Sequence, residues 1–164
     1  MNLYAESAPV FVHFLTTLKS IIAKARAHAT EEKFDENVLL TTRLYPDMFA
    51  FTRQVQIACD SAKGAVARLS GTEVPKHPDT EATFDELLAR IDKTIAFIRS
   101  IDEASFAGAA DRHIELKFGD WKREFKGVDF LRTWALPNFY FHLTTAYALL
   151  RHNGVPVGKF DFLG

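Results

Sequence analysis

The chain has 164 residues, with 20 basic and 21 acidic side chains and a formal net charge of −1. A length of this order suits one domain with a full core, and we predict a single domain over residues 1–164. The balanced charge, without a long run of one sign, argues against nucleic acid or an anionic membrane surface as a partner.

Two amphipathic helices are predicted in the first half of the chain. In the first, Pro9 suits the opening turn, and apolar residues recur at helical spacing to about Ala29. In the second, Asp47 follows a proline and is the expected N-cap, and the apolar pattern runs on until Ser70 and Gly71. The intervening segment is predicted to be a connection with a short helix.

A third helix and a hairpin are predicted next. Thr83 and Glu86 have the spacing of a capping box at the start of an apolar helical pattern that reaches Ile101. From His113 the period changes to that of a strand, and Gly119 with Asp120 provides a two-residue turn.

The expected hairpin register follows from the position of that turn. It pairs Phe118 with Trp121 and Ile114 with Phe125. Both pairs then lie on one apolar face, which we expect to lie on the helical bundle.

The last long helix is predicted from Asp129, as N-cap, to about Arg151. It is apolar nearly all round, which indicates a buried helix. Pro137 interrupts its backbone hydrogen bonding and is expected to kink it. We therefore predict an all-α, four-helix protein with a small β-hairpin between the third and fourth long helices.

Location follows from features that are absent. Residues 1–7 lack a basic segment followed by an apolar run, and no apolar run approaches the length of a membrane span. Cys59 is the only cysteine, which excludes an intramolecular disulfide and a thiolate zinc cluster. We expect no membrane insertion and a cytoplasmic protein.

Candidate functional residues are polar side chains on lines where the pattern expects core. Asn138 and His142 are four residues apart and share a face of the last helix, and Thr145 continues that face. Gln54 points toward the core side of the second helix. A buried polar group needs a partner, so these residues either satisfy one another between helices or line a pocket.

The other side of the second helix carries a polar stripe. Arg53, Gln56, Asp60 and Lys63 recur there at helical spacing, and we interpret them as a solvated face. Cys59 is interpreted as a small buried residue.

Two stretches resemble a known superfamily. RLYPDMF (43–49) with RQVQIACD (53–60), and LPNFYFH (136–142) with YALLRHNG (147–154), are similar to the DinB/YfiT-like superfamily of predicted metalloenzymes. Within it, the whole chain resembles a bacterial family of unknown function. The resemblance implies an up-down-down-up four-helix bundle.

The resemblance also implies a site. Superfamily members hold zinc or nickel with one histidine on the second helix and two on the fourth, and these positions correspond to Gln54, Asn138 and His142 here. Only His142 keeps the imidazole, and neutral amides are weak zinc ligands beside it. We therefore expect no tightly bound metal, with a weakly held divalent ion such as zinc or nickel as the alternative.

Three hypotheses remain open from the sequence. The first is a polar inter-helix pocket that binds a small molecule at a degenerate metal site. The second is a metal-dependent thiol transferase or isomerase with His142 as principal ligand. The third is a structural or regulatory homodimer without catalysis. A homodimer is expected because the 15 phenylalanines exceed the needs of one core of this size.

Overall fold

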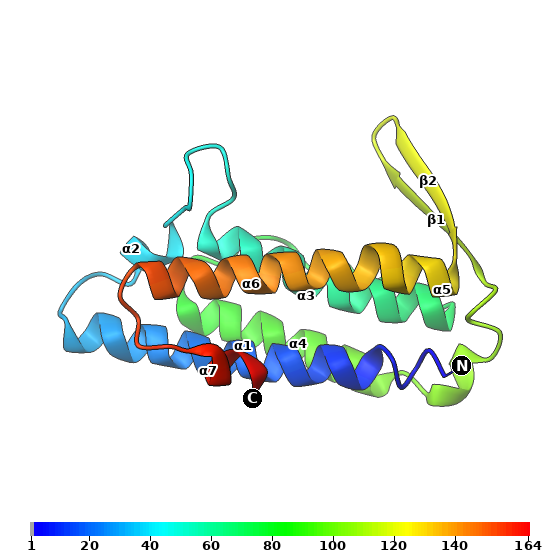
Figure 1. Cartoon of the computed structure of the whole chain (residues 1–164), viewed down its shortest axis with the longest axis horizontal. Coiled ribbons are helices and arrows are strands. Elements are labelled where there is room, and N and C mark those ends of the chain that lie inside the picture. The colour runs from blue at the N-terminus through cyan, green and yellow to red at the C-terminus, as the bar shows by residue number, and fades with distance from the viewer. Residues whose placement is uncertain (1) are drawn as a thin grey trace.

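The computed structural model describes residues 2–164 and is mostly helical. Four long helices lie side by side (Figure 1): α1 (Ala8–Glu31), α3 (Phe51–Ser70), α4 (Phe84–Ser100) and α6 (Leu136–His152). In Figure 1 the chain runs in one direction along α1 and α6 and in the other along α3 and α4. Helix α3 packs against α4 and α6, and α1 packs against α4 and α6 in turn.

Short elements connect these helices. They are α2 (Asn37–Leu40), the 3₁₀-helix η1 (Glu103–Phe106), β1 (His113–Phe118), β2 (Trp121–Lys126), α5 (Gly127–Phe130), the π-helical turn η2 (Leu131–Ala135) and α7 (Lys159–Leu163). Within residues 2–164, no helix is long and apolar enough to cross a membrane.

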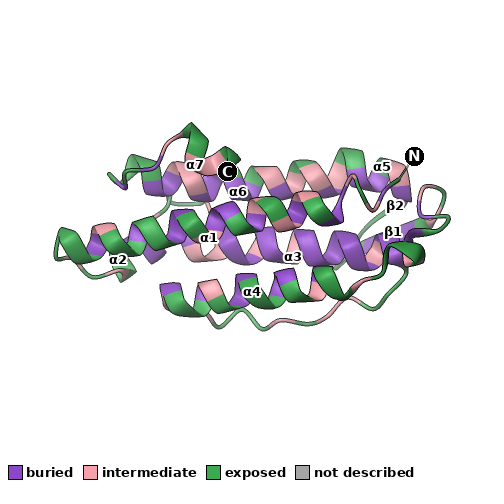
Figure 2. Cartoon of the chain, turned by 90° about the horizontal axis from the view of Figure 1, so that it is seen from below, coloured by how far each residue is buried: buried purple, intermediate pink, exposed green. Residues whose placement is uncertain are grey.

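The core lies between the four long helices, and phenylalanines dominate it. Phe11 and Phe139 meet edge to face with ring centroids 4.9 Å apart, and Phe51 meets Phe84 at 6.1 Å. All four side chains are fully buried. Figure 2 shows that α3 is the most continuously buried helix, because it is covered on several sides. Polar side chains on α3 are therefore placed where they must find partners.

Helix α3 begins at Phe51, so the prediction of Asp47 as its N-cap is wrong. The N-cap is Ala50, which offers no side-chain hydrogen bond. The preceding segment closes on itself instead: the Phe51 N–H donates to the Thr42 carbonyl at 3.0 Å. The start of this helix is therefore set by a hydrogen bond that closes the preceding loop. A side-chain cap from a neighbouring residue had been expected. At the other end, Gly71 adopts a left-handed conformation with φ of 77° and ends the helix as predicted.

The predicted capping box of α4 is confirmed. The Glu86 N–H donates to Thr83 Oγ1 at 3.2 Å, and the Thr83 N–H donates to the Glu86 carboxylate at 3.1 Å. The two reciprocal bonds lie within four residues, which explains why local reasoning finds them.

The hairpin register is also confirmed. Phe118 pairs with Trp121 and Ile114 with Phe125. Its expected placement is only half right, because Leu116 is buried whereas the Phe118 side chain is 60% exposed. Figure 1 shows the hairpin projecting from the bundle at the α5 end. Ile114 and Phe125 are buried, whereas Phe118 and Trp121, next to the turn, remain exposed.

The last long helix is interrupted as expected, but in a different form. Asp129 does not cap it and lies inside α5. The backbone stays helical throughout, and a π turn over Leu131–Ala135 precedes Pro137 in the first turn of α6. The Leu136 N–H donates to the Leu131 carbonyl, five residues back. Pro137, which has no N–H to offer, thus follows directly on a wider turn of the helix.

Candidate functional site

The structure brings Gln54 and His142 together between α3 and α6. His142 Nδ1 and Gln54 Oε1 are 2.7 Å apart, and both side chains are buried. The Gln54 amide NH₂ donates to the Phe49 carbonyl at 3.0 Å. Its oxygen therefore faces the imidazole, so that His142 Nδ1–H is the donor and Nε2 carries the lone pair.

Burial sets the charge of this histidine. Desolvation, followed by the positive charge of Arg53, lowers the pKa of His142 to about 4. The ring is neutral at physiological pH. Nε2 has no hydrogen-bond partner within residues 2–164 and is not sealed inside the protein. The site thus offers one oriented hydrogen-bond acceptor.

Asn138 does not join this pair. Its amide nitrogen lies 3.2 Å from Ser61 Oγ on α3 and donates to it. Thr145, on the same face of α6, donates to the Phe141 carbonyl at 2.7 Å. The predicted convergence of three polar side chains is therefore observed for Gln54 and His142 alone.

The three positions implied by the superfamily do not fit its metal site. The Gln54 oxygen already accepts from His142, and Asn138 turns toward Ser61. Among the described residues, no group of three His, Cys, Asp or Glu side chains is placed to hold an ion. A single neutral imidazole with an occupied amide beside it lacks the three strong donors that a catalytic zinc requires.

Asn138 instead lies in the wall of a large groove of about 780 Å³. One wall is α3, and the others are the 71–82 loop, the turn end of β1 and the segment from α5 to α6. We call this cavity the α3 groove. Its apolar lining residues are Ile57, Ala65, Val74, Pro75, Pro78, Leu116, Phe118, Phe130, Trp134 and Ala135; its polar ones are Arg53, Asp60, Ser61, Lys63, Arg68, Lys76, His77 and Asn138.

Phe118 and Trp134 lie on the hairpin side of the groove. The rings of Trp121 and Trp134 are stacked at 5.2 Å with an interplanar angle of 29°, and Phe118 lies against Trp121. These are the two tryptophans of the chain. A ligand beside Trp134 in the α3 groove would therefore lie close to both tryptophans.

His77 projects from the loop side. Its Nδ1 is buried and has no hydrogen-bond partner in the described part of the chain. Burial and then the charges of Lys63, Lys93 and Arg90 lower its pKa, so the ring is neutral. His77 was not predicted to be functional, because a histidine in a proline-flanked loop carries no signal of burial.

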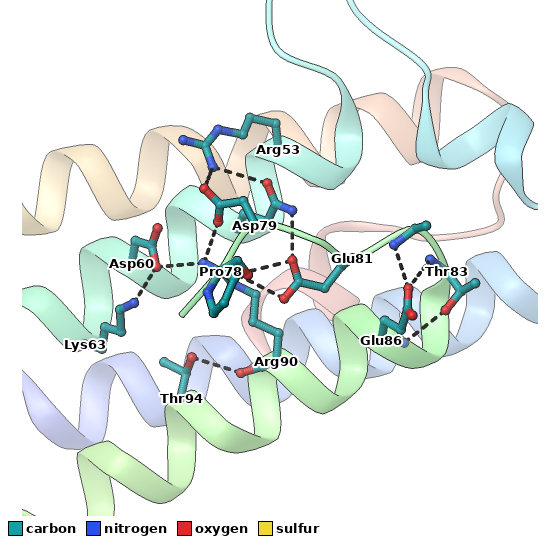
Figure 3. Close-up of polar contacts among 12 residues, drawn as sticks. Arg53, Asp60, Lys63, Pro78, Asp79, Glu81, Thr83, Glu86, Arg90 and Thr94 are labelled. Carbon is teal, nitrogen blue, oxygen red and sulfur yellow. Dashed lines mark hydrogen bonds and ion pairs between the residues drawn. The ribbon is translucent and has the colours of Figure 1, made fainter. Parts of the chain in front are cut away.

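The polar stripe of α3 is not the solvated face that was predicted. Gln56 and Lys63 are each only 4% exposed, because the 71–82 loop and Arg90 of α4 cover them. Figure 3 shows the resulting network. Arg90 binds Asp60 at 2.8 Å, Asp79 at 2.9 Å and Glu81 at 3.0 Å. Lys63 binds Asp60 at 2.7 Å.

The positive and negative charges of this network compensate one another. Burial alone would raise the pKa of Glu81, but hydrogen bonds from Arg90, its own backbone and Gln56 hold that pKa below its usual range. The one sequence signal for this cluster was Arg90 itself, which stands between Leu87 and Ile91 on the apolar line of α4. A charge there requires buried counter-charges.

Cys59 lies deep beneath the network, as predicted. It is fully buried, and desolvation raises its pKa to about 12 in spite of the nearby Arg90. The thiol is not ionised at neutral pH, so it is no nucleophile.

Comparisons with known proteins place this arrangement in a family. Residues 3–163 match the family model described as "Domain of unknown function (DUF1993)". A crystal structure of a DinB family member protein from Shewanella denitrificans is 46% identical, with a TM-score of 0.92 over 99% of this chain and 92% of that one. No curated protein matches the chain. The fold is therefore DinB-like, and the chain belongs to the DUF1993 family, as the sequence resemblance indicated.

Proposed function

We propose that this protein binds a small organic molecule in the α3 groove and does so without a metal. The observation that supports this is the groove itself. Its volume of about 780 Å³ lies within the range of small-molecule sites, roughly 300–1,000 Å³. Its lining is mostly apolar with a few polar groups at fixed positions, such as Ser61 and Asn138, which hold each other across α3 and α6.

The test uses a neutral aromatic probe, N-phenyl-1-naphthylamine, whose fluorescence rises in apolar sites. We expect saturable binding with quenching of the Trp121–Trp134 pair. Ser61→Phe should fill the groove and weaken binding about tenfold or more. Ser20→Phe adds the same side chain at an exposed site on α1 and should change nothing. Failure of the wild type to bind, or equal binding by Ser61→Phe, would contradict the proposal.

The absence of tight zinc binding is part of the proposal. It rests on the chemistry of the positions: one imidazole, with the Gln54 oxygen engaged by His142. Metal analysis of untagged protein should give zinc and nickel well below one equivalent. A stoichiometric metal lost in His142→Ala would instead favour the alternative, a metal-dependent thiol transferase or isomerase, because His142 presents a free, neutral Nε2.

Three further properties concern the topology, the assembly and the location of the protein. We infer an up-down-down-up order for the four long helices, which the chain directions in Figure 1 support. A homodimer is supported by the large apolar side chains left exposed, such as Tyr45, Phe49 and Phe141. The cytoplasmic location expected from the sequence stays a prediction.

A further inference from the structure

The basic side chains that line the α3 groove differ in whether a carboxylate pairs with them. Arg53 is paired with Asp79, and Lys63 with Asp60. Arg68 also lines the groove, yet no carboxylate within residues 2–164 lies within ion-pair distance of it. Among the described residues its one hydrogen bond goes from Nη1 to the Gly64 carbonyl at 3.0 Å, one turn back on α3.

Arg68 is also partly removed from water. Its side chain is half-buried, and burial lowers the pKa of its guanidinium. A guanidinium has five N–H donors, and only one of its nitrogens is used here. A desolvated cation without a counter-charge is costly to hold, which makes this point of the groove favourable for an anion.

Gly64 determines where the guanidinium lies. A Cβ at Gly64 would stand 2.5 Å from Arg68 Nη1, so the arginine lies across the part of α3 that has no side chain. Since the arginine end is flexible, an alanine there would displace the guanidinium and leave the helix intact. Lys76, exposed on the loop that also lines the groove, adds a second positive charge without a carboxylate partner among the described residues.

An apolar surface begins next to this cation. Arg68 shares the lining of the groove with apolar residues, among them Ala65, one turn back on α3, and Val74, Leu116 and Trp134. A ligand that satisfies both parts has a negative head and an apolar or aromatic body. We propose that the α3 groove selects an amphipathic organic anion, with Arg68 as the residue that binds its anionic group. This inference rests on the proposed function and specifies its ligand class.

The test compares two probes with the same aromatic body. 1-Anilinonaphthalene-8-sulfonate carries an anionic group, whereas N-phenyl-1-naphthylamine does not. We expect Arg68→Gln to weaken binding of the sulfonate about tenfold, the usual scale for losing a charged hydrogen bond, and to leave the neutral probe within about twofold. Arg99→Gln removes an exposed arginine at the end of α4 and should alter neither.

Gly64→Ala separates binding from folding. Alanine favours a helix interior over glycine by roughly 1 kcal/mol, so thermal stability should not fall, while displacement of the guanidinium should weaken sulfonate binding several-fold. If Arg68→Gln fails to fold by circular dichroism, Gly64→Ala and Lys76→Gln take its place. Unchanged sulfonate binding in these folded variants would overturn the inference.

Competition against the bound sulfonate probe tests whether the ligand needs an apolar body. Octanoate should displace it, and inorganic phosphate at the same concentration should not. Equal displacement by phosphate would show that charge alone is recognised, which contradicts an amphipathic ligand. If the neutral probe binds the wild type but Arg68 has no effect, only this inference fails. If neither probe binds, the proposed function fails with it.

Discussion

His142 is held as a neutral ring by its surroundings, and this has a consequence for acid stability. In the folded protein its pKa is about 4, against an ordinary value of 6.5. Between these two values the unfolded chain binds a proton that the folded protein does not. Stability should therefore be complete above about pH 6.5 and should fall as the pH drops toward 4.

We predict that urea unfolding at pH 7 and pH 5 will differ through this residue. The wild type should lose about 1 kcal/mol of unfolding free energy from His142, after allowance for solvent screening. His142→Gln removes the titrating group and should lose correspondingly less over the same interval. An identical pH dependence in both proteins would show that the imidazole is not held neutral. His152, exposed at the end of α6, provides the control substitution His152→Gln.

Arg90 is the residue on which the buried network depends. Its side chain is 1% exposed and joins α4 to Asp60 of α3 and to Asp79 and Glu81 of the 71–82 loop. Removal of one partner from a buried ion network is strongly destabilising, because the remaining charges lose their compensation.

We predict that Arg90→Met will lower the free energy of unfolding by about 3 kcal/mol. Arg99→Gln, at an exposed position of the same helix, should stay within about 0.5 kcal/mol. In a double-mutant cycle, Glu81→Gln should cost much less in the Arg90→Met background than alone. Additive effects in denaturant melts would mean that the 3.0 Å contact between the two side chains contributes nothing.

At the level of elements, the entry from β2 into α5 depends on one glycine. A Cβ at Gly127 would lie 1.9 Å from the carbonyl oxygen of Ala109, which belongs to the backbone and cannot rotate away. The Val128 N–H donates to the Ala110 carbonyl at 3.1 Å in the same place. Two backbone segments therefore approach here as closely as a glycine permits.

We predict that Gly127→Ala will destabilise the protein by about 2–3 kcal/mol, since one of the two segments has to move. Gly158→Ala is the matched control: its Cβ would meet only the Asp161 carboxylate, at 4.0 Å. Thermal melts of both variants measure the difference. Equal melting temperatures would mean that the hairpin and the residue 109 segment separate without cost.

Predictions from the sequence succeeded where the interacting residues are close along the chain. The capping box of α4 and the hairpin register each depend on a few neighbouring side chains. The start of α3 depends on Thr42 across a closed loop, and burial of the α3 stripe depends on Arg90, 30 residues from Asp60. Periodicity assigns a face to a residue but does not say which segment covers that face.

The candidate site also has a part that was predicted from the sequence and a part that was not. Gln54 was correctly placed toward the core by its position on α3, and its bond to His142 follows from the need of each for a partner. Asn138 lies one turn from His142 on the same face, yet it meets Ser61 instead. The α3 groove itself was not predicted, because it is bounded by a loop and a hairpin whose positions in space no local pattern specifies.

At the scale of the whole molecule, apolar side chains remain exposed on structures that project from the bundle. Tyr45 and Phe49 lie in the 41–50 loop, and Phe118 and Trp121 at the hairpin tip. Figure 1 shows that loop and the hairpin on the same side of the bundle, with α6 running between their bases. Phe141, 56% exposed, projects from α6. A surface of this kind is what a second copy of the chain would cover.

We predict that the protein forms a homodimer through this side. Light scattering at micromolar concentration should give twice the chain mass of 18.5 kDa. Phe141→Asp places a charge at an exposed position of α6 and should shift the mass toward that of the monomer, because burying an unpaired carboxylate is costly. Phe160→Asp introduces the same charge on α7, where the phenylalanine is 85% exposed, and should leave the dimer intact.

A monomer mass for the wild type at every concentration would contradict the dimer. A dimer that survives Phe141→Asp but not Phe160→Asp would place the interface on the α7 side.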